Sequence, residues 1–316
     1  MFFSRFPVRT NNGDHLSNIS IVNAITFYNA SLYFYNISAV FYQCSFNDTA
    51  MYFSSGKARI LFFVESTWTG RRNSKVEIKN YRYIRFFQCL FTNIFNYNNT
   101  TLILIYKNKN IFIRHCLFTN IIGNLMNSWF SYNIFINHTV VKNIKFSYYH
   151  TNKIPYLFHF YGRTNIFIRD SVFACVYGAS VIKTRQIPSA QISTSKLILN
   201  VSIFINITSG TAGCSLNVVN CTSISIMGCR FVSNEAKRGG SVSLMKVNYL
   251  SVRNSVFSRN SANTAGGAIY LVNINNTMLA NLFIIQNSGS SYGGGMYALQ
   301  CNRIIVATCN ISNNSG

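Results

Sequence analysis

The residues that could carry acid–base chemistry are few and scattered. The chain has six acidic residues, which are Asp14, Asp48, Glu65, Glu77, Asp170 and Glu235. Carbohydrate-cleaving sites need two or three carboxylates within about 5–10 Å of one another, or an acidic calcium site beside a base. Against 28 Lys and Arg, the six acids leave a formal net charge of +22. This balance weighs against most hydrolases and favours anionic partners. The excess of Lys, Asn, Ile, Phe and Tyr would also follow from nucleotide bias in an AT-rich genome.

Nine cysteines and five histidines offer no nucleophile and no metal site by their spacing. No CxxC pair is present, and nine Cys in 316 residues is not the density of a disulfide scaffold. Five of the thiols recur at one inward position of the repeat described next, namely Cys44, Cys89, Cys116, Cys229 and Cys309. That recurrence predicts buried structural thiols rather than catalytic ones. We expect no catalytic residue, no metal and no cofactor.

The elements that would position any site come from an internal repeat. One core residue per unit, here called the anchor, recurs every 19–31 residues. The anchors are Phe27, Phe46, Trp68, Phe91, Phe118, Phe146, Phe173, Phe204, Phe231, Phe257, Ile284 and Ile311. Five positions before each anchor the residue is apolar, and two positions before it the residue is small or aliphatic. The repeat is clearest over 197–316, and over 81–196 and 1–80 it rests on this core pattern alone.

Apolar residues alternate within each unit, and this period of two is typical of strands. Units of this length hold about three short strands, and stacking them about 4.8 Å apart produces a parallel β-helix. The sequence therefore predicts one all-β solenoid domain over 1–316, with three sides and about a dozen coils. The chain stops at Gly316 within a coil, which predicts that it is a fragment of a longer chain.

The C-terminal units carry a more specific motif. Each of the last four anchors is followed three residues later by Asn, and the first three of these are then followed by paired glycines. These positions are Phe231, Asn234, Gly239 and Gly240; Phe257, Asn260, Gly266 and Gly267; Asn287, Gly294 and Gly295; and Asn314. Asn suits turns because it tolerates left-handed backbone, and its amide can form a ladder between coils. Paired Gly indicates bends with positive φ or crowded backbone.

The combination F-x-x-N followed by G-G-A-I, as in FSRN at 257–260 and GGAI at 266–269, resembles the polymorphic outer-membrane protein (Pmp) repeat. The resemblance covers about 197–316. It implies a right-handed parallel β-helix of the pectin-lyase-like kind that is displayed at a cell surface, often for adhesion.

One group of residues suggests binding. Arg114, Lys142 and Arg169 lie four before their anchors on three consecutive predicted coils. Stacked about 4.8 Å apart, they would form a basic stripe that suits an anionic ligand such as a sulfated or sialylated glycan, an acidic lipid or a nucleic acid. No recognised nucleic-acid module accompanies them. A chance column is the competing explanation, because basic residues greatly outnumber acids.

The sequence features that bear on cellular location favour a surface or secreted protein. N-x-S/T sequons are more frequent than chance, and the candidates for glycosylation are Asn18, Asn36, Asn47, Asn137, Asn220 and Asn275. The start MFFSRFPVRT is no secretory signal, and no stretch is long and apolar enough for a transmembrane helix. We expect a surface or secreted protein whose signal peptide and any membrane anchor lie outside this chain.

Together these features predict a non-enzymatic β-helical surface protein, adhesin-like or structural, whose partners are host or matrix glycans or another anionic surface. Two alternatives stay open at this point. One is a β-helix lyase or hydrolase, which a convergent cluster of acids in the folded chain would favour. The other is a basic intracellular solenoid that binds an anionic partner, which unmodified Asn side chains and reduced thiols would favour.

Overall fold

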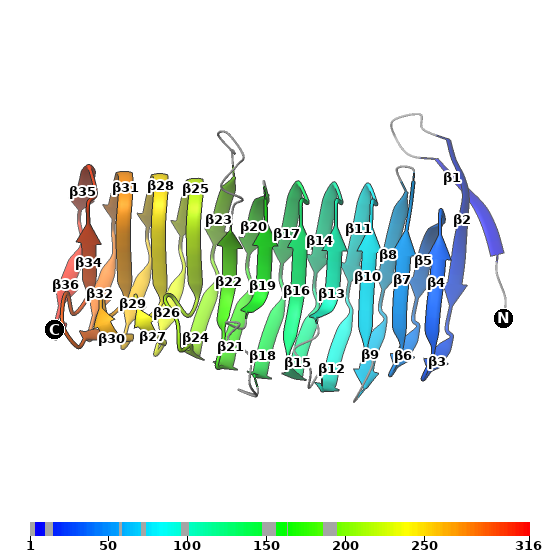
Figure 1. Ribbon diagram of the computed structural model, residues 1–316, viewed down its shortest axis with the longest axis horizontal. Coiled ribbons are helices and arrows are strands. Elements are labelled where there is room, and N and C mark those ends of the chain that lie inside the picture. Colours follow the sequence, from blue (N-terminus) through cyan, green and yellow to red (C-terminus); the bar gives the residue numbers. More distant parts are fainter. Residues whose placement is uncertain are drawn as a thin grey trace.

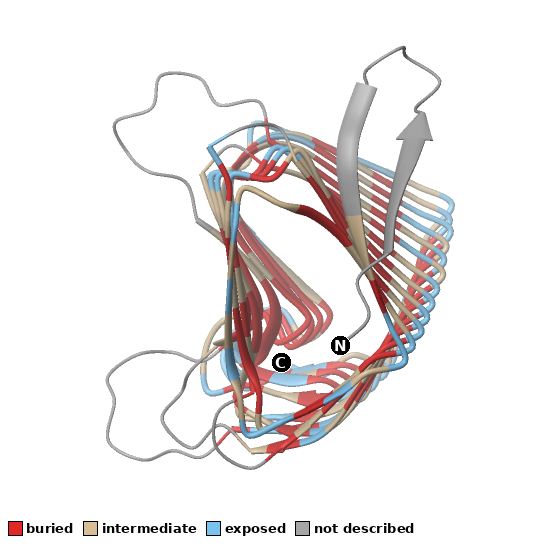
Figure 2. Ribbon diagram, turned by 90° about the vertical axis from the view of Figure 1, so that its right-hand side faces the viewer, coloured by how far each residue is buried: buried red, intermediate tan, exposed pale blue. Residues whose placement is uncertain are grey.

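The computed structural model describes residues 4–9, 15–56, 59–70, 74–95, 101–146, 156–162, 164–185 and 195–316. Over these residues the chain is a parallel β-solenoid whose coils stack from one terminus to the other (Figure 1). Seen along the stack, the coils superimpose around a single elongated core of buried residues (Figure 2). The predicted all-β solenoid is confirmed, and no helix able to cross a membrane occurs among the residues described.

Each coil has three sides. The first side consists of β2 (His15–Asn23), β5 (Ser38–Tyr42), β8 (Ile60–Val64), β11 (Tyr83–Phe87), β14 (Asn110–Arg114), β17 (Asn133–Asn137), β20 (Asn165–Arg169), β23 (Lys196–Asn200), the second halves of β25 (Leu216–Met227), β28 (Val242–Arg253) and β31 (Ile269–Ala280), and β35 (Arg303–Ala307). β1 (Ser4–Arg9) pairs antiparallel with β2.

The second side contains the anchors. It consists of β3 (Thr26–Tyr28), β6 (Ser45–Asn47), β9 (Thr67–Gly70), β12 (Leu90–Phe95), β15 (Leu117–Ile122), β18 (Val140–Lys145), β21 (Val172–Tyr177), β24 (Ile203–Thr208), β26 (Arg230–Val232), β29 (Val256–Ser258), β32 (Phe283–Ile285) and β36 (Asn310–Ser312). Short strands β27 (Glu235–Arg238), β30 (Ser261–Ala265) and β33 (Ser288–Gly289) extend it in the last coils.

The third side leads the chain back to the first side of the next coil. It consists of β4 (Ser31–Tyr35), β7 (Ala50–Ser54), β10 (Lys75–Lys79), β13 (Thr101–Tyr106), β16 (Asn124–Trp129), β19 (Tyr156–Tyr161), β22 (Ser180–Arg185), the first halves of β25, β28 and β31, and β34 (Met296–Leu299).

The anchor ladder corrects the predicted coil count. From Trp68 to Ile311 it makes nine turns, whose commonest length is 27 residues, rather than a dozen turns of that size. Two shorter turns of 19 and 22 residues, from Phe27 through Phe46 to Trp68, come before them. Stacked anchor rings with centroids 4.4 to 5.3 Å apart form the spine of the core.

One anchor was predicted wrongly. The ladder passes from Phe118 to Val141 and then to Phe173, so Val141 and not Phe146 is the anchor of that coil. An aromatic anchor is not required, because a buried valine fills the same position between two phenylalanine rings. The residue two before Val141 is Thr139, a buried hydroxyl, which fits the column of small residues better than Ile144 did.

The C-terminal motif is confirmed with two corrections. Asn234, Asn260 and Asn287 form the predicted buried amide ladder, but the left-handed residue is the one before each, such as Ser233 with φ 53°. The glycines aligned with Gly239–Gly240 and Gly266–Gly267 are residues 293–294, one before the predicted pair Gly294–Gly295. Gly240 avoids a Cβ because that atom would lie 2.1 Å from the carbonyl oxygen of Gly267.

Candidate functional site: a basic corner and an adjoining groove

The corner between the first and second sides is built in the same way in most coils. One residue with positive φ turns the chain, and a small buried residue follows it. That buried side chain donates back to the strand it has just left. Thr139 Oγ1 donates to the carbonyl of Asn137 at 3.1 Å, and Ser171 Oγ donates to the carbonyl of Arg169 at 2.9 Å. These bonds fix the turn, so the outward residues beside it are held at a constant position from coil to coil.

In three consecutive coils this corner presents ionisable side chains. The turn residues are His115, His138 and Asp170, which stand in one column. The two imidazole rings stack with centroids 4.7 Å apart, and His138 Nε2 lies 3.5 Å from Asp170 Oδ2. Each turn residue follows the last residue of its strand, which is Arg114 in β14 and Arg169 in β20. We call Arg114, His115, His138, Arg169 and Asp170 the basic corner.

The charges of the basic corner are only partly paired. Arg169 Nε lies 3.0 Å from Asp170 Oδ2, and its side chain is 67% exposed. The Arg114 guanidinium lies 5.3 Å from the centroid of the Phe112 ring, and its Nε has no hydrogen-bond partner among the described residues. Two guanidinium groups and one carboxylate leave the corner positive even with both imidazoles neutral. Protonation of the histidines adds to that charge.

The predicted vertical stripe is therefore only partly present. Arg114 and Arg169 share a column, but Asn137 stands between them, so they are about 10 Å apart at two coil steps. Lys142 lies in β18 on the second side, paired with Thr119 and not with Arg114. Its predicted place in the stripe was wrong because it followed from the anchor Phe146.

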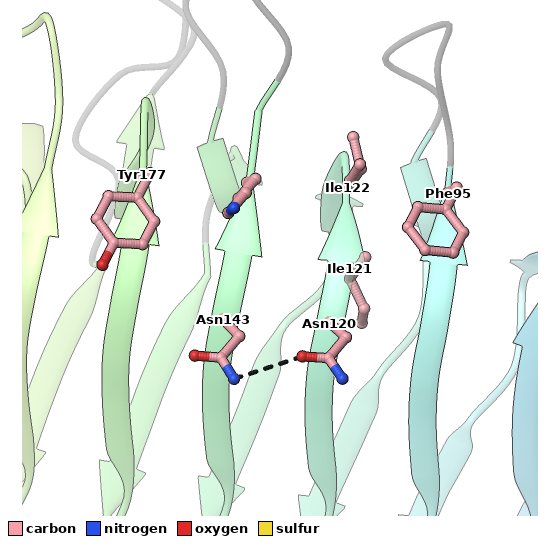
Figure 3. A pocket seen from close by; sticks show the side chains of 7 residues that line it. Phe95, Asn120, Ile121, Ile122, Asn143 and Tyr177 are labelled. Atoms are coloured by element: carbon pink, nitrogen blue, oxygen red, sulfur yellow. Dashed lines mark hydrogen bonds between the residues drawn. The ribbon is translucent and has the colours of Figure 1, made fainter.

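Lys142 instead lies on a surface that leads from the basic corner to a groove. β18 exposes Lys142 and Lys145 on its outer face. The groove beside Lys145 spans strands β12, β15, β18 and β21 and has a volume of about 730 Å³ (Figure 3). We call this the second-side groove, and its described lining residues are Phe95, Asn120, Ile121, Ile122, Asn143, Lys145 and Tyr177.

Phe95, Ile122, Lys145 and Tyr177 form one row across the coils of the second-side groove, and amides form a second row beside it. Figure 3 shows Phe95 and Tyr177 at its two ends, and Ile122 lies between them. Asn143 Nδ2 donates to Asn120 Oδ1 at 3.4 Å, and this bond is part of an outward amide ladder. Flat rings beside amides and a cation suit a sugar chain, whose rings have apolar faces and hydroxyl rims.

The acidic residues that the structure describes do not converge, and Asp14 lies outside the described residues. Glu65 and Asp170 both turn the corner between the first and second sides, and four coil steps separate them, as their spacing predicted. Gln43 Nε2 donates to Glu65 at 3.0 Å. Partial burial opposes ionisation of Glu77, but bonds from Lys75 and Lys79 outweigh it and lower the pKa of Glu77. No group of three or more His, Cys, Asp or Glu in the described part of the chain could hold a metal ion.

The predicted thiol column is present, and its members donate to main-chain carbonyls. Cys116 Sγ donates to the carbonyl of Arg114 at 3.3 Å, and Cys89 Sγ donates to that of Phe87 at 3.4 Å. Burial raises the pKa of Cys89 well above its ordinary value and raises that of Cys229 to about 11. A thiol held protonated in this way is a poor nucleophile and a poor metal ligand. All nine cysteines are free.

The sequon asparagines occupy different environments. Asn36, Asn47, Asn137 and Asn220 are half-buried and Asn275 is exposed, whereas the side chain of Asn18 lies outside the described residues. Asn275 donates to Asn248 Oδ1 and accepts from Asn302 Nδ2, each at 3.2 Å. Asn137 stands between Arg114 and Arg169, so a glycan there would cover the basic corner.

The histidine pair was missed by the sequence analysis, which assigned no acid partner to any histidine. Position was the available signal, because His115 and His138 each stand directly before a small residue of the inward column, as Asp170 does.

No family model, curated protein or solved structure matched this chain in comparisons with known proteins.

Proposed function

We propose that this chain is a non-enzymatic β-solenoid surface or secreted protein that binds anionic glycans through the basic corner. The observation that carries the proposal is the column of Arg114, His115, His138 and Arg169 on three consecutive coils, with Asp170 as its single acid. Guanidinium groups hold sulfate and carboxylate through two parallel hydrogen bonds. Two of them about 10 Å apart suit a ligand with repeated anionic groups.

The surface beyond the corner supports an extended ligand. From the corner, the outer face of β18 presents Lys142 and then Lys145 at the edge of the second-side groove. A glycan lying across the second side would meet the guanidinium groups at one end and Phe95, Asn120 and Tyr177 at the other. Affinity would then come from cations and specificity from the rings and amides.

Display at a surface is supported by the sequons and by the repeat motif that resembles Pmp surface proteins. A scaffold role rather than catalysis is supported by the separation of the carboxylates. Intact mass of the protein from its native source, before and after enzymatic deglycosylation, tests the location. Loss of several glycans supports export, and an unchanged mass with free thiols favours an intracellular anionic partner.

Binding to immobilised heparin at 150 mM salt tests the ligand class, with heparin that has been desulfated, N-acetylated and carboxyl-reduced as the neutral comparison. We expect Arg114→Gln/Arg169→Gln to weaken heparin binding about tenfold or more, because two charge-assisted contacts are lost. Lys142→Gln/Lys145→Gln should weaken it by a smaller factor, because a lysine is a point charge without the guanidinium fork.

The matched control is Arg253→Gln/Arg303→Gln, which removes the same charge from exposed sites on later coils. It should change heparin affinity about twofold or less, since only the general field is reduced. Equal losses of heparin affinity in Arg114→Gln/Arg169→Gln and in the control variant would contradict a site at the corner. Undiminished binding to this neutral heparin derivative would contradict an anionic ligand.

A further inference from the structure

A second cleft lies on the C-terminal coils, at the corner between the extended second side and the third side. Its lining residues are Lys237, Arg238, Thr264, Ala265, Tyr270, Tyr292 and Tyr297, and its volume is about 410 Å³. We call it the tyrosine cleft. None of these residues belongs to the basic corner or to the second-side groove, and the sequence analysis assigned them no role.

Register brings the three tyrosines together. Tyr270 in β31 pairs with Tyr297 in β34, one coil later. Their rings stack with centroids 5.5 Å apart and planes 10° apart. Tyr292, which forms a bridge with Ala265, tilts against the Tyr297 ring at 6.0 Å and 43° and is 65% exposed. The cleft therefore presents the exposed side chain of Tyr292 beside the half-buried Tyr297 and the buried Tyr270.

Two exposed cations stand beside these rings. The Arg238 guanidinium lies 5.6 Å from the centroid of the Tyr270 ring, and Lys237 precedes it in β27. No ion pair among the described residues involves either cation. Glu235 is the single acid of that strand, and it lines a different pocket. Stacking on Tyr270 orients the guanidinium and leaves its edge free for a bidentate partner.

The backbone under the cleft is fixed. Thr264 Oγ1 donates to the carbonyl of Lys237 at 2.7 Å, which ties β30 to β27. Gly239 directly follows Arg238 with φ 58°, and a Cβ there would lie 2.9 Å from the Cβ of Tyr270. The Cβ of Tyr270 thus lies close to the turn that carries Arg238, which places the guanidinium beside the Tyr270 ring.

We infer that the tyrosine cleft binds one terminal acidic sugar, a pyranose that bears a carboxylate or a sulfate. The anionic group pairs with the edge of the Arg238 guanidinium and with Lys237. The apolar face of the sugar ring lies on the exposed ring of Tyr292, while the phenol hydroxyl groups bond to the sugar hydroxyls. The inference does not depend on glycan binding at the basic corner, because the two sites share no residue.

The size of the cleft favours a sugar terminus over a nucleic acid strand. Its volume lies in the range of small-molecule sites, and its rings belong to two neighbouring coils only. A single-stranded nucleic acid needs a longer basic track and successive stacking rings. Tyr270 and Tyr297 stack on each other, so no base can enter between them.

Calorimetric titration of the full chain with 3′-sialyllactose and with a chondroitin 4-sulfate disaccharide tests the inference. Lactose serves as the neutral probe and an eight-residue oligouridylate as the rival. We expect at least one acidic sugar to bind at least tenfold more tightly than lactose. Arg238→Gln should weaken that binding about tenfold or more, and Tyr292→Ala about three- to tenfold.

Both substitutions are at exposed positions, and circular dichroism verifies that each variant folds. Arg238→Lys keeps the charge without the fork and should recover only part of the affinity. Tyr249→Ala, at a tyrosine that is 59% exposed on β28, is the matched control and should bind like the wild type. Arg114→Gln/Arg169→Gln should also bind these small sugars like the wild type, so failure at the corner and failure at the cleft are distinguishable.

Three results would overturn the inference. The wild-type chain could bind neither acidic probe, or could bind lactose equally well. Arg238→Gln and Tyr292→Ala could bind the acidic sugar as tightly as the Tyr249→Ala control does. The oligouridylate could bind more tightly than both sugars and lose affinity in the same two variants, which would assign the cleft to nucleic acid.

Discussion

The middle coils and the C-terminal coils place different types of residue at the same position of the core. Three residues after the anchor, the middle coils place a buried aliphatic residue, and these residues are Ile94, Ile121, Ile144, Val176 and Ile207. In the C-terminal coils the same register holds Asn234, Asn260, Asn287 and Asn314. One column is an apolar stack, and the other is an amide ladder inside the core.

The path of the backbone explains why one column is apolar and the other is made of amides. In the middle coils the strand runs on past the anchor, as in β15, and its main chain stays in the sheet. In the C-terminal coils the strand breaks, as between β26 and β27, and the side chain takes over those bonds. Asn260 Oδ1 accepts from the main-chain N–H of Asn234 at 3.1 Å, and Asn260 Nδ2 donates to the carbonyl of Phe231 at 3.1 Å. A polar residue is tolerated in this core because every partner is supplied.

The largest effect is expected from making a C-terminal coil resemble a middle one. Asn260→Leu leaves the Asn234 N–H and the Phe231 carbonyl buried without partners, and it also removes the acceptor of Ser241 Oγ. We expect a loss of about 3–6 kcal/mol in the free energy of unfolding, because each orphaned group costs about 1–3 kcal/mol. Urea denaturation measures the total. Hydrogen exchange should place the loss in the C-terminal coils, because solenoid coils contact only their neighbours.

The reverse change tests the other half of the comparison. Ile121→Asn places an amide in a column where the main chain of β15 is already paired with β12 and β18. We expect a loss of about 3–5 kcal/mol in unfolding free energy, from lost apolar packing and an unsatisfied amide. Ile121→Val is the conservative control and should cost about 1 kcal/mol. Wild-type stability in Ile121→Asn would show that the two registers are interchangeable.

The glycine bend is the third point of difference. A Cβ on Gly267 would lie 1.9 Å from the carbonyl oxygen of Gly294, which belongs to the next coil. We expect Gly267→Ala to cost about 2–3 kcal/mol, because the backbone of two coils must move apart. A Cβ on Gly56 would lie 3.7 Å from its nearest neighbour, Asn36 Oδ1, so Gly56→Ala should change the free energy of unfolding by less than about 1 kcal/mol. Equal effects at the two glycines would contradict the crowding argument.

Alkaline pH should destabilise the early and the late coils through different groups, and each group should contribute about as much as the glycine substitution does. Burial raises the pKa of Tyr81 to about 12 from 10.0, and that of Cys221 and of Cys229 to about 11 from 9.0. The folded chain holds these protons more tightly than the unfolded chain. The stability is therefore complete below the unfolded pKa and is lost as pH rises through the folded one.

Each of these groups contributes about 2–3 kcal/mol to that loss. The midpoint of urea-induced unfolding, recorded between pH 8 and 12, measures this loss of stability. Tyr81→Phe should remove the part between pH 10 and 12, and Cys229→Ala should remove part of the decline between pH 9 and 11. A flat profile in the wild-type chain would mean that these groups titrate as they do in the unfolded chain.

The smallest effect is expected outside the core. Asp170→Asn removes a half-buried carboxylate that pairs with the exposed side chains of Arg169 and His138, and such surface pairs contribute about 0–1 kcal/mol. Stability should scarcely change, whereas heparin affinity should increase because the only acid of the basic corner is lost. Weaker heparin binding by this variant would show that Asp170 organises the corner rather than opposing its ligand.

The sequence was sufficient for the fold because like residues recur at one period. Stacking aligned the small residues Cys44, Ser66 and Cys89 and the amides of the C-terminal ladder, and each of these columns could be recognised from its spacing. The predicted anchor failed in the coil of Val141, where a short turn from Phe118 is followed by a long turn to Phe173. Without a regular interval or an aromatic residue, the small residue Thr139 two positions earlier was the remaining signal in the sequence that favoured Val141 over Phe146.

The sites were harder to predict because they depend on which outward residues become neighbours. The interval from His115 to His138 is much shorter than the interval from His138 to Asp170, and this inequality concealed their column. In the tyrosine cleft, Tyr270 and Tyr297 share a register, but Tyr292 comes from a turn. The misplaced anchor of a single coil was enough to move Lys142 into the wrong column.

The most direct test of the account is therefore the register at the basic corner. In a chain with His115→Cys/His138→Cys, a short thiol-to-thiol crosslinker such as dibromobimane should join the two positions efficiently, because they lie about 5 Å apart on adjacent coils. The pair Arg114→Cys/Lys142→Cys should stay unlinked, with the wild-type chain as the background. Peptide mass mapping identifies the linked residues. Crosslinking of 114 to 142 but not of 115 to 138 would contradict the register, and with it the basic corner on which the proposed function rests.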